Sequence, residues 1–326
     1  MLSWSDTLVI TLVALAADAV IGDPDWLWRR LAHPVAIIGR AIAALDRALN
    51  RDAWSPARRK GAGIAAVLLL VIAALLTGYA IEAIIPRGPA GDIALGLLAS
   101  TLIAQKSLYQ HVARVHAAFS AGGLAAAREA VSLIVGRDPN SLDESGVSRA
   151  AVESCAENFS DGVVAPTLSL ALLGLPGLLA YKTINTADSM IGHRSDKHRD
   201  FGWASARLDD LVNLVPARLA SLLLALAAPV ARGSIVSSLK VMRRDARNHR
   251  SPNAGWPESA MAGALGVKLA GPRRYAEGMV DDPYLNAAGR DATPADIRCA
   301  LRMLIAASGI QFAVISVLTC IAFGAG

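Results

Sequence analysis

The sequence predicts an all-α, polytopic integral membrane protein with bent or re-entrant helices and sizeable cytoplasmic helical loops. Hydrophobic residues make up 54 % of its 326 residues and charged residues only 18 %, with a mean hydropathy of +0.42. This composition leaves too little polar surface for a water-soluble globule of this size. Several apolar runs also approach the length of about 20 residues that crosses the hydrocarbon core of a bilayer. We therefore expect a single membrane domain over residues 1–326.

The expected spans lie near residues 7–21, 61–85, 92–110, 163–180, 211–230 and 303–323. The first of them ends before Pro24, because proline disfavours a helical conformation in the residue that precedes it. No basic segment precedes this run, so it is interpreted as a retained membrane segment rather than a cleaved signal peptide.

The second span follows a basic stretch and is interrupted only by Glu82 near its end. Its basic flank, Arg58 to Lys60, is expected to face the cytoplasm, where positive charges next to membrane spans accumulate. The third span is predicted as part of one long helix that starts near Ile93 and continues through the amphipathic stretch to His116. Ala121-Gly122-Gly123 should end that helix.

The fourth span is broken by Pro166 and by the stretch Gly174-Leu175-Pro176-Gly177. Such breaks are typical of bent or re-entrant helices, which aim free backbone groups at a ligand. In the fifth segment, Pro216 is expected to bend the helix before Arg218. The sixth is an uninterrupted apolar run.

Positive charges predict that both large basic loops, which follow residues 22 and 232, are cytoplasmic. If segments 163–180 and 211–230 both crossed completely, the loop over residues 181–207 would lie outside. We therefore favour re-entrant segments, which keep that loop and the candidate site on the cytoplasmic side of the cell membrane.

Other functional classes lack their sequence signals. The net charge is +5, but no Lys/Arg run is interleaved with aromatic residues, so nucleic acid is not an expected partner. The sequence contains no P-loop, HExxH or GxSxG motif. Cys155, Cys299 and Cys320 are isolated and are expected to be packing residues.

Charged and amide residues gather between Glu153 and Arg218, beside apolar runs where an unpaired charge is costly. Glu153 and Glu157 are four residues apart on one predicted helix, with Asp161 one turn later. Like charges at this spacing destabilise a helix, so either the face is solvated or a cation or substrate amine lies among them. Arg207 and Asp210 could form an ion pair of purely structural importance. Oxygen ligands of this kind favour Mg²⁺ and phosphate chemistry.

Several polar blocks resemble the CobD/CbiB family, the adenosylcobinamide-phosphate (cobinamide) synthases. They are D-x3-GDP from Asp18 with HPV at His33, GRD at Gly136, ES-x2-EN-x-SDG-x3-P from Glu153, YK-x-IN-T-x-DSMIG from Tyr181, FG-x3-AR-x-DD-x2-N-x2-PAR from Phe201, and SPN-x-GWPE-x-AMAGALGV from Ser251. The blocks cover essentially the whole chain. Small departures at Leu173, Ala187 and His193 remove no ionisable group that the family pattern requires.

The resemblance implies a ligase in the lipid bilayer that joins (adenosyl)cobyric acid, a corrinoid, to (R)-1-amino-2-propanol or its O-phosphate. The product is (adenosyl)cobinamide or its phosphate. Forming an amide from a carboxylate requires activation, most simply by ATP with Mg²⁺. Other cobalamin-pathway enzymes are the partners that the resemblance suggests.

The family blocks and the clustering together give a set of site residues. The expected catalytic residues are Glu153, Glu157, Asp161, Asp188, Asp209 and Asp210. Of these, Asp188, Asp209 and Asp210 are assigned to Mg²⁺. The expected substrate-binding residues are Asn158, Lys182, Asn185, Arg207, Asn213, Arg218, His249, Asn253 and Glu258.

Two other functions compete with this hypothesis. A membrane prenyl- or phospho-transferase also binds Mg²⁺-diphosphate between Asp-rich helices, but its Asp-rich repeats have closer spacing. A non-enzymatic membrane sensor or transport component would not need to retain all the carboxylates.

Overall fold

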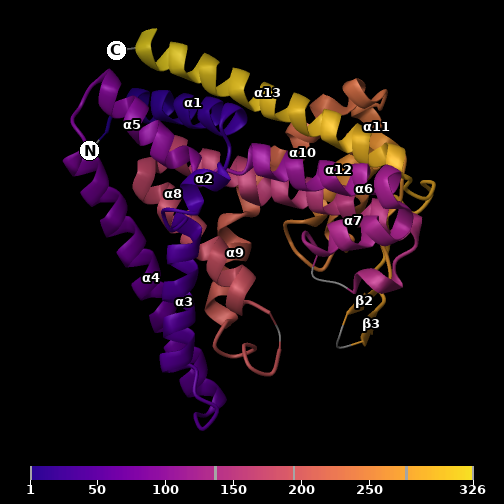
Figure 1. Ribbon diagram of the computed structural model, residues 1–326, viewed down its shortest axis with the longest axis horizontal. Coiled ribbons are helices and arrows are strands. Elements are labelled where there is room, and N and C mark those ends of the chain that lie inside the picture. The colour runs from indigo at the N-terminus through magenta and orange to yellow at the C-terminus, as the bar shows by residue number, and fades with distance from the viewer. Residues whose placement is uncertain (1, 136–137, 194, 276–277, 325–326) are drawn as a thin grey trace. The chain divides into compact units, whose positions relative to one another are not determined.

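The computed structural model describes residues 2–135, 138–193, 195–275 and 278–324, without the side chains of residues 25 and 273–280. Gly136 and Arg137 of the GRD block lie outside the described residues. The described chain is almost entirely helical, which confirms the all-α class (Figure 1). The α-helices are α1 (Trp4–Val20), α2 (Asp25–Trp28), α3 (Pro34–Leu49), α4 (Pro56–Ile84), α5 (Pro89–Ser100), α6 (Gln105–Ser132), α7 (Glu144–Phe159), α8 (Ala165–Ile191), α9 (Trp203–Val212), α10 (Leu214–Ala227), α11 (Ile235–Asp245), α12 (Gly255–Leu265) and α13 (Pro294–Gly324).

Short elements complete the fold. A π-helical turn, Ser160–Val164, joins α7 to α8. Four short strands, β1 (Leu269–Ala270), β2 (Arg273–Tyr275), β3 (Gly278–Val280) and β4 (Tyr284–Leu285), form the antiparallel pairs β1–β4 and β2–β3.

Four helical segments in the described part of the chain are long and apolar enough to cross a membrane. They are Pro56–Ile84, Glu144–Ile191, Leu214–Ala231 and Pro294–Gly324. At 1.5 Å per residue, the 29 residues of α4 extend about 43 Å, which exceeds the hydrocarbon core. This is an all-α membrane protein, as the composition predicted.

The chain forms two compact units. Unit 1 comprises Met1–Ala104, Ala165–Asn213 and Ile315–Gly326, and unit 2 comprises Gln105–Val164 and Leu214–Val314.

Local sequence explains where the main helices begin. Ser3 caps α1 in a capping box with Asp6, so two backbone N–H groups that lack helical partners are satisfied. Ser55 accepts a hydrogen bond from the Arg58 N–H at the start of α4, where Pro56 needs no hydrogen-bond partner. Asp143 caps α7 through the Gly146 N–H.

Unit 1 is built on α4 and the second half of α8, which pack side by side in opposite directions. Near the end of α4, Gly78 lies so close to Pro176 that an added Cβ would come within 2.4 Å of its Cα. Near the start of α4, Ala66 shares a buried apolar cluster with Ile191. The C-terminal end of α8 therefore lies beside the first turns of α4.

The predicted bend in the fourth span occurs at Gly174, whose φ of 67° is a conformation that glycine adopts easily. Just after the bend, the Leu175 N–H donates to the Glu82 carboxylate at 2.9 Å. This hydrogen bond satisfies a backbone donor that the kink releases. Pro166 was expected to break the same span. The irregularity instead lies directly before it, at the π-helical turn.

Two further sequence-based expectations are wrong. The helix predicted from Ile93 to His116 is interrupted, because α5 ends at Ser100 and α6 starts at Gln105. The bend expected at Pro216 lies at Asn213, between α9 and α10. Pro216 falls within the first turn of α10, where a missing N–H costs no helical hydrogen bond. The predicted stop at Gly122 and Gly123 is confirmed, since both have non-helical dihedral angles.

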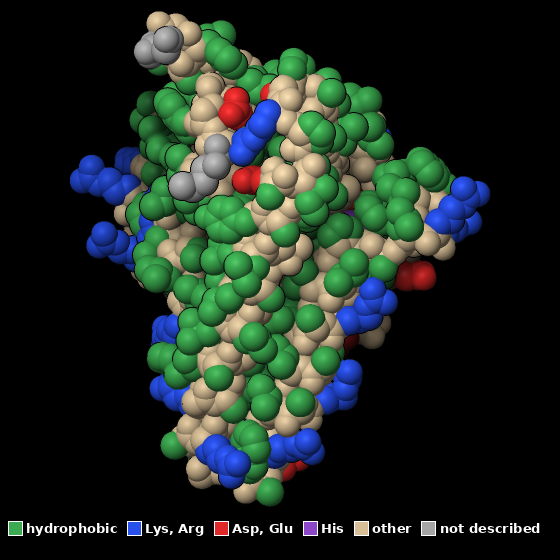
Figure 2. Space-filling view, turned by 90° about the vertical axis from the view of Figure 1, so that its left-hand side faces the viewer, with side chains coloured by type: hydrophobic (Ala, Val, Ile, Leu, Met, Phe, Trp, Pro, Cys, Tyr) green, Lys and Arg blue, Asp and Glu red, His purple; other side chains and the backbone are tan. Residues whose placement is uncertain are grey.

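The surface of unit 1 has a basic end and an apolar face. Figure 2 shows Lys and Arg side chains at its lower end and a broad hydrophobic surface above them. Arg58 stacks over Trp54 at 3.9 Å and Lys60 over Trp203 at 3.7 Å. Tryptophan and basic residues together are typical of the boundary between lipid and water. The exposed apolar residues of α4 are Ile64, Leu68, Leu69, Ile72, Leu76, Tyr79 and Ile84.

Unit 2 packs α12 against α7, α10 and α11. Helix α12 is buried along most of its length and ends at Gly266, which adopts the left-handed conformation that commonly terminates helices. Ser238 on α11 donates to the Ala260 carbonyl at 2.6 Å, so the small residues of the two helices approach closely.

Candidate functional site

Unit 1 brings four of the predicted site residues together where α8, α9 and Asn213 meet. Asn185 on α8 donates from its side-chain amide to the Asp209 carboxylate on α9 at 3.3 Å. One turn earlier on α8, the Tyr181 hydroxyl donates to the Asn213 side-chain oxygen at 2.9 Å. The i,i+4 spacing of Tyr181 and Asn185 places both on the same face of α8. In this arrangement the Asn185 and Asn213 amides lie near the Asp209 carboxylate.

The Asp209 carboxyl group has a strongly shifted pKa. Burial and the nearby Asp188 carboxylate raise the pKa of Asp209 to about 6, although the Asn185 and Asn213 amides oppose the rise. Asp188 follows Asn185 by three residues on α8 and is partly buried. Two carboxylates that repel each other in a partly buried site would be stabilised by a cation.

Asp210 and Arg207 have a different environment from Asp209. Arg207 lies 3.6 Å from Asp210, and the side chains are 59 % and 35 % exposed. This i,i+3 contact is the ion pair that the sequence suggested as a structural alternative. Exposed ion pairs of this kind contribute little to the free energy of folding. Lys182 is partly buried on α8.

In unit 2, the acidic residues of α7 do not share one environment. Glu153 is 4 % exposed and accepts a hydrogen bond from the Ala270 N–H at 2.7 Å, with Arg149 at 4.0 Å. Glu157 and Asn158, one turn further on, are exposed. Asp161 is partly buried in the π-helical turn. Single π-helical turns occur frequently at functional sites.

A second polar cluster in unit 2 joins α10 to the start of α12. Arg218 donates to the Asn253 side chain at 2.9 Å and stacks over the Trp256 ring at 4.5 Å. His249 and Glu258 lie 3.8 Å apart, and Glu258 is only 1 % exposed. These four predicted residues therefore cluster within one unit.

The structure thus forms two groups of predicted residues, one in each unit. Unit 1 holds Lys182, Asn185, Asp188, Arg207, Asp209, Asp210 and Asn213, and unit 2 holds Glu153, Glu157, Asn158, Asp161, Arg218, His249, Asn253 and Glu258. The convergence of both groups on one ligand remains a prediction.

Sequence reasoning did not select Tyr181 or Trp256 as site residues, although both lie in the polar blocks quoted above. Tyr181 precedes Asn185 by one helical turn, and this spacing could have identified it. Trp256 could not have been found by spacing, because its contact with Arg218 joins segments 38 residues apart.

Comparisons with known proteins agree with the polar blocks. The family model described as CobD/Cbib protein matches residues 11–304. The chain is 52 % identical over 311 residues to Cobalamin biosynthesis protein CobD of Rhizobium meliloti (strain 1021), covering 94 % of this chain and 95 % of the relative. It is 50 % identical over 298 residues to the protein of that name from Brucella suis biovar 1 (strain 1330), covering 90 % and 91 % of the two chains.

A third similar protein is Cobalamin biosynthesis protein CobD of Rhodobacter capsulatus, 49 % identical over 286 residues and covering 88 % and 89 % of the chains. No solved structure matches the chain. A family match over nearly the whole length, together with relatives near 50 % identity, shows that the chain belongs to the CobD/CbiB family.

Proposed function

We propose that this protein is an amide-forming ligase of cobalamin biosynthesis. It would join the free carboxyl group of (adenosyl)cobyric acid to (R)-1-amino-2-propanol or its O-phosphate. Family membership and the names of the relatives support the pathway. The observation that carries the chemistry is the Asp188 and Asp209 carboxylate pair beside the Asn185 amide.

Joining a carboxylate to an amine has two requirements. The carboxylate must gain a leaving group, and the amine must lose a proton to become nucleophilic. Transfer of the γ-phosphoryl group of ATP to the carboxylate oxygen breaks the bond to the β-phosphate, releases ADP and gives an acyl phosphate. The amine nitrogen then attacks the acyl carbon, the C–O bond to phosphate breaks, and the nitrogen releases a proton.

The residues of unit 1 fit a Mg²⁺–ATP complex. Mg²⁺ in nucleotide sites is held by one or two carboxylates, while phosphates and water supply the other ligands. Asp188 and Asp209 provide such a pair, and Asp210 is the third candidate ligand. Among the described residues, no group of three or more His, Cys, Asp or Glu side chains is arranged to hold a metal ion. The phosphates would therefore complete the coordination, and Lys182 and Arg207 would neutralise phosphoryl oxygens.

The residues of unit 2 suit the amine and the corrinoid. The Glu153 carboxylate already accepts the Ala270 N–H, so the exposed Glu157 is better placed to bind the ammonium group and remove its proton. Asn158 and Asp161 follow it on the same segment. Arg218, His249, Asn253 and Glu258 would contact the polar amide side chains or phosphate of the substrates.

The packing of unit 1 supports a site on the cytoplasmic side of the cell membrane. The α8–α9 connection lies at the basic end of α4, where Arg59 donates to the Lys197 carbonyl. If that end is cytoplasmic, as the positive-inside tendency indicates, α9 is cytoplasmic as well. Asp209 would then lie on the side where ATP is available, even if the second half of α8 crosses the bilayer.

The test is product formation by membranes that contain the protein. Membranes with the wild-type chain are incubated with cobyric acid, aminopropanol or aminopropanol phosphate, ATP and Mg²⁺, and corrinoids are separated by chromatography. The proposal expects cobinamide or its phosphate only when all components are present. Membranes with Asp188→Asn serve as the matched negative control. Absence of product from well-expressed wild-type protein with either amine would refute the proposed activity.

A further inference from the structure

A buried carboxylate outside the candidate site holds the connection between α8 and α9. Asp46, near the end of α3, is 7 % exposed. The Lys197 ammonium group lies 2.8 Å from it, and the His198 ring lies 3.4 Å from it. The Asn50 side-chain amide donates to the same carboxylate at 2.8 Å. Both basic partners belong to the segment that joins α8 to α9.

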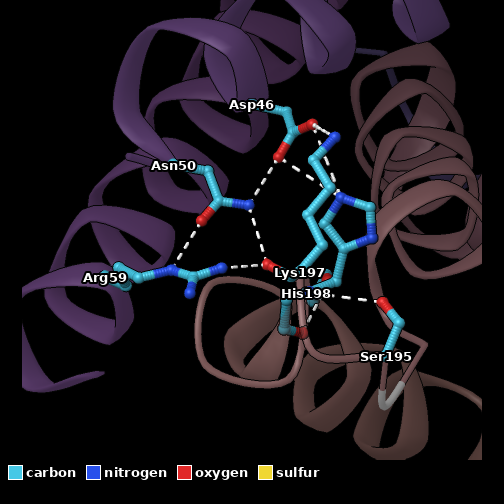
Figure 3. Close-up of polar contacts among 8 residues, drawn as sticks. Asp46, Asn50, Arg59, Ser195, Lys197 and His198 are labelled. Atoms are coloured by element: carbon cyan, nitrogen blue, oxygen red, sulfur yellow. Dashed lines mark hydrogen bonds and ion pairs between the residues drawn. The ribbon is translucent and has the colours of Figure 1, made fainter. Parts of the chain in front are cut away.

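A second set of contacts fixes the backbone of that segment (Figure 3). Asn50 donates to the Lys197 carbonyl at 3.0 Å and accepts a hydrogen bond from Arg59 at 2.8 Å. Arg59 also donates to the Lys197 carbonyl. Helices α3 and α4 therefore bind both the side chain and the main chain of Lys197. We call Asp46, Asn50, Arg59, Lys197 and His198 the Asp46 cluster.

The anchored segment continues directly into α9. The Gly202 N–H donates to the His198 carbonyl at 2.7 Å, and the Ala206 N–H donates to the Gly202 carbonyl at 3.1 Å. Between His198 and Gly202, the Phe201 side chain is fully buried in the apolar cluster of α3, α4 and α8. A Cβ added at Gly63 would lie 1.9 Å from the Phe201 carbonyl oxygen, so α4 also contacts this backbone closely.

Helices α8 and α9 carry the two halves of the unit 1 site. Asn185 and Asp188 lie on α8, and Asp209 lies two turns into α9. Their relative position depends on the segment over residues 192–202, because this segment is the covalent link between the two helices. A shift of about 1 Å in a ligand or catalytic group is enough to reduce activity greatly.

An apolar contact could stabilise the same connection without burying a charge. The Asp46 side chain is 9 % exposed but that of Lys197 is 60 % exposed, and an ion pair open to solvent on one side contributes little net stability. The Asp46 cluster uses directional contacts to the side chain and to the carbonyl of the same lysine. Its geometry is therefore suited to setting position rather than only adding stability.

We propose that Asp46 is a positioning residue for the candidate site, acting through Lys197 and His198 to place Asp209 of α9 against Asn185 and Asp188 of α8. This inference rests on the proposed function, since it assigns Asp46 an effect on the Mg²⁺–ATP group of residues. Asp46 itself does not touch the substrates.

The experiment compares Asp46→Asn with Asp52→Asn in membranes. Asp52 is an exposed carboxylate in the α3–α4 connection, so this variant is a matched control. In Asp46→Asn, the Mg²⁺ concentration for half-maximal product formation should rise at least fivefold. The rate at saturating Mg²⁺ should fall by less than fivefold. Asp52→Asn should match the wild type in both quantities.

Variants at Lys197 give an independent comparison. Lys197→Arg keeps a cation opposite Asp46 and should retain the wild-type Mg²⁺ requirement. Lys197→Met removes the cation and should behave like Asp46→Asn. A purely structural role would lower the amount of folded protein in the variants without changing the Mg²⁺ requirement of the remainder, and that result would overturn the proposal.

Amide hydrogen exchange separates this inference from the proposed activity. The amides of His198, Arg199 and Gly202 are hydrogen-bonded within the anchored segment, so their exchange reports its opening. They should exchange at least tenfold faster in Asp46→Asn than in the wild type or Asp52→Asn. Unchanged exchange refutes the anchoring. If these amides exchange faster in Asp46→Asn but the wild-type protein makes no cobinamide, the anchoring is upheld. The proposed function and the positioning role are then both refuted.

Discussion

Two carboxylates of unit 1 lie on either side of the same connection and have opposite electrostatic environments. Asp46 is buried, but hydrogen bonds from Lys197, Asn50 and His198 outweigh the effect of burial and lower its pKa. Burial and the Asp188 carboxylate raise the pKa of Asp209 to about 6. The first carboxylate is compensated by the protein itself. The second lies beside another carboxylate, an environment that is typical of a group that binds a cation.

The two carboxylates also affect stability in opposite directions as the pH changes. Asp46 has a lowered pKa in the folded state, so its stabilising contribution is present at neutral pH and disappears as the pH falls below 3.8 through that lowered value. Asp209 has a raised pKa, so the folded state binds a proton more tightly between pH 3.8 and about 6. Its contribution to stability is lost as the pH rises through about 6.

The largest expected effect comes from removing the uncompensated charge. Asp209→Asn should lower the rate of product formation by about 100-fold or more, because the site loses one of the carboxylates assigned to Mg²⁺. Its melting temperature in detergent should stay the same or rise, because the repulsion from Asp188 is removed. Rates and melting curves of purified protein measure both effects. A rate near that of the wild type would remove Asp209 from the site.

The next effect tests the packing that supports the compensated carboxylate. Gly63→Ala should reduce the free energy of unfolding by about 1–3 kcal/mol, since overpacked contacts cost energy in this range. The clash is with the Phe201 backbone, which cannot rotate away as a side chain could. Thermal unfolding measures the loss. Gly61→Ala is the control, since its added Cβ would have no atom within 4 Å.

A third prediction uses the raised pKa of Asp209. The Mg²⁺ concentration for half-maximal product formation should increase about tenfold per pH unit below about 6, because protonation competes with the metal for the carboxylate. Above pH 7 it should be constant. The measurement is a Mg²⁺ titration at several pH values between 5 and 8. A Mg²⁺ requirement that does not change over this range would contradict the assignment of Asp209.

The smallest effect is expected at the exposed pair. Arg207→Gln should change the free energy of unfolding by less than about 1 kcal/mol, because solvent screens the contact with Asp210. The informative quantity is the apparent KM for ATP. A higher apparent KM for ATP with an unchanged free energy of unfolding would support phosphate binding by Arg207. If neither quantity changes, the ion pair is only a surface contact and Arg207 is not part of the site.

Several local features could be predicted from the sequence because they depend on neighbouring residues. Gly174 bends the fourth span because its positive φ suits a glycine, and Gly123, with a φ of 65°, interrupts α6 for the same reason. The apolar run from Ile93 and the amphipathic stretch after it suggested one helix, but the structure has two, of which α5 packs against α1 and α6 against α7. The choice between Pro216 and Asn213 as the bend was not visible in the sequence, because a proline near the start of a helix is harmless.

The candidate site could also be predicted only in part from the sequence. The polar blocks identified the residue types, and the i,i+3 and i,i+4 spacings placed Asn185 and Asp188 correctly on one helix. Spacing could not show that Glu153 accepts a backbone N–H 117 residues away, or that Glu157 on the same helix is exposed. These differences arise from which segments pack against each face.

By itself, the sequence determined that this protein is a helical membrane protein of the CobD/CbiB type, since composition and polar blocks require no knowledge of packing. Only the tertiary structure decided which acidic groups are neutralised within the protein. Asp209 lies in one of the polar blocks and Asp46 does not, but neither sequence neighbourhood shows which charges surround the carboxylate in the folded protein. The charges that surround each come from distant parts of the chain, and electrostatic interactions depend on distance in space rather than on separation in sequence.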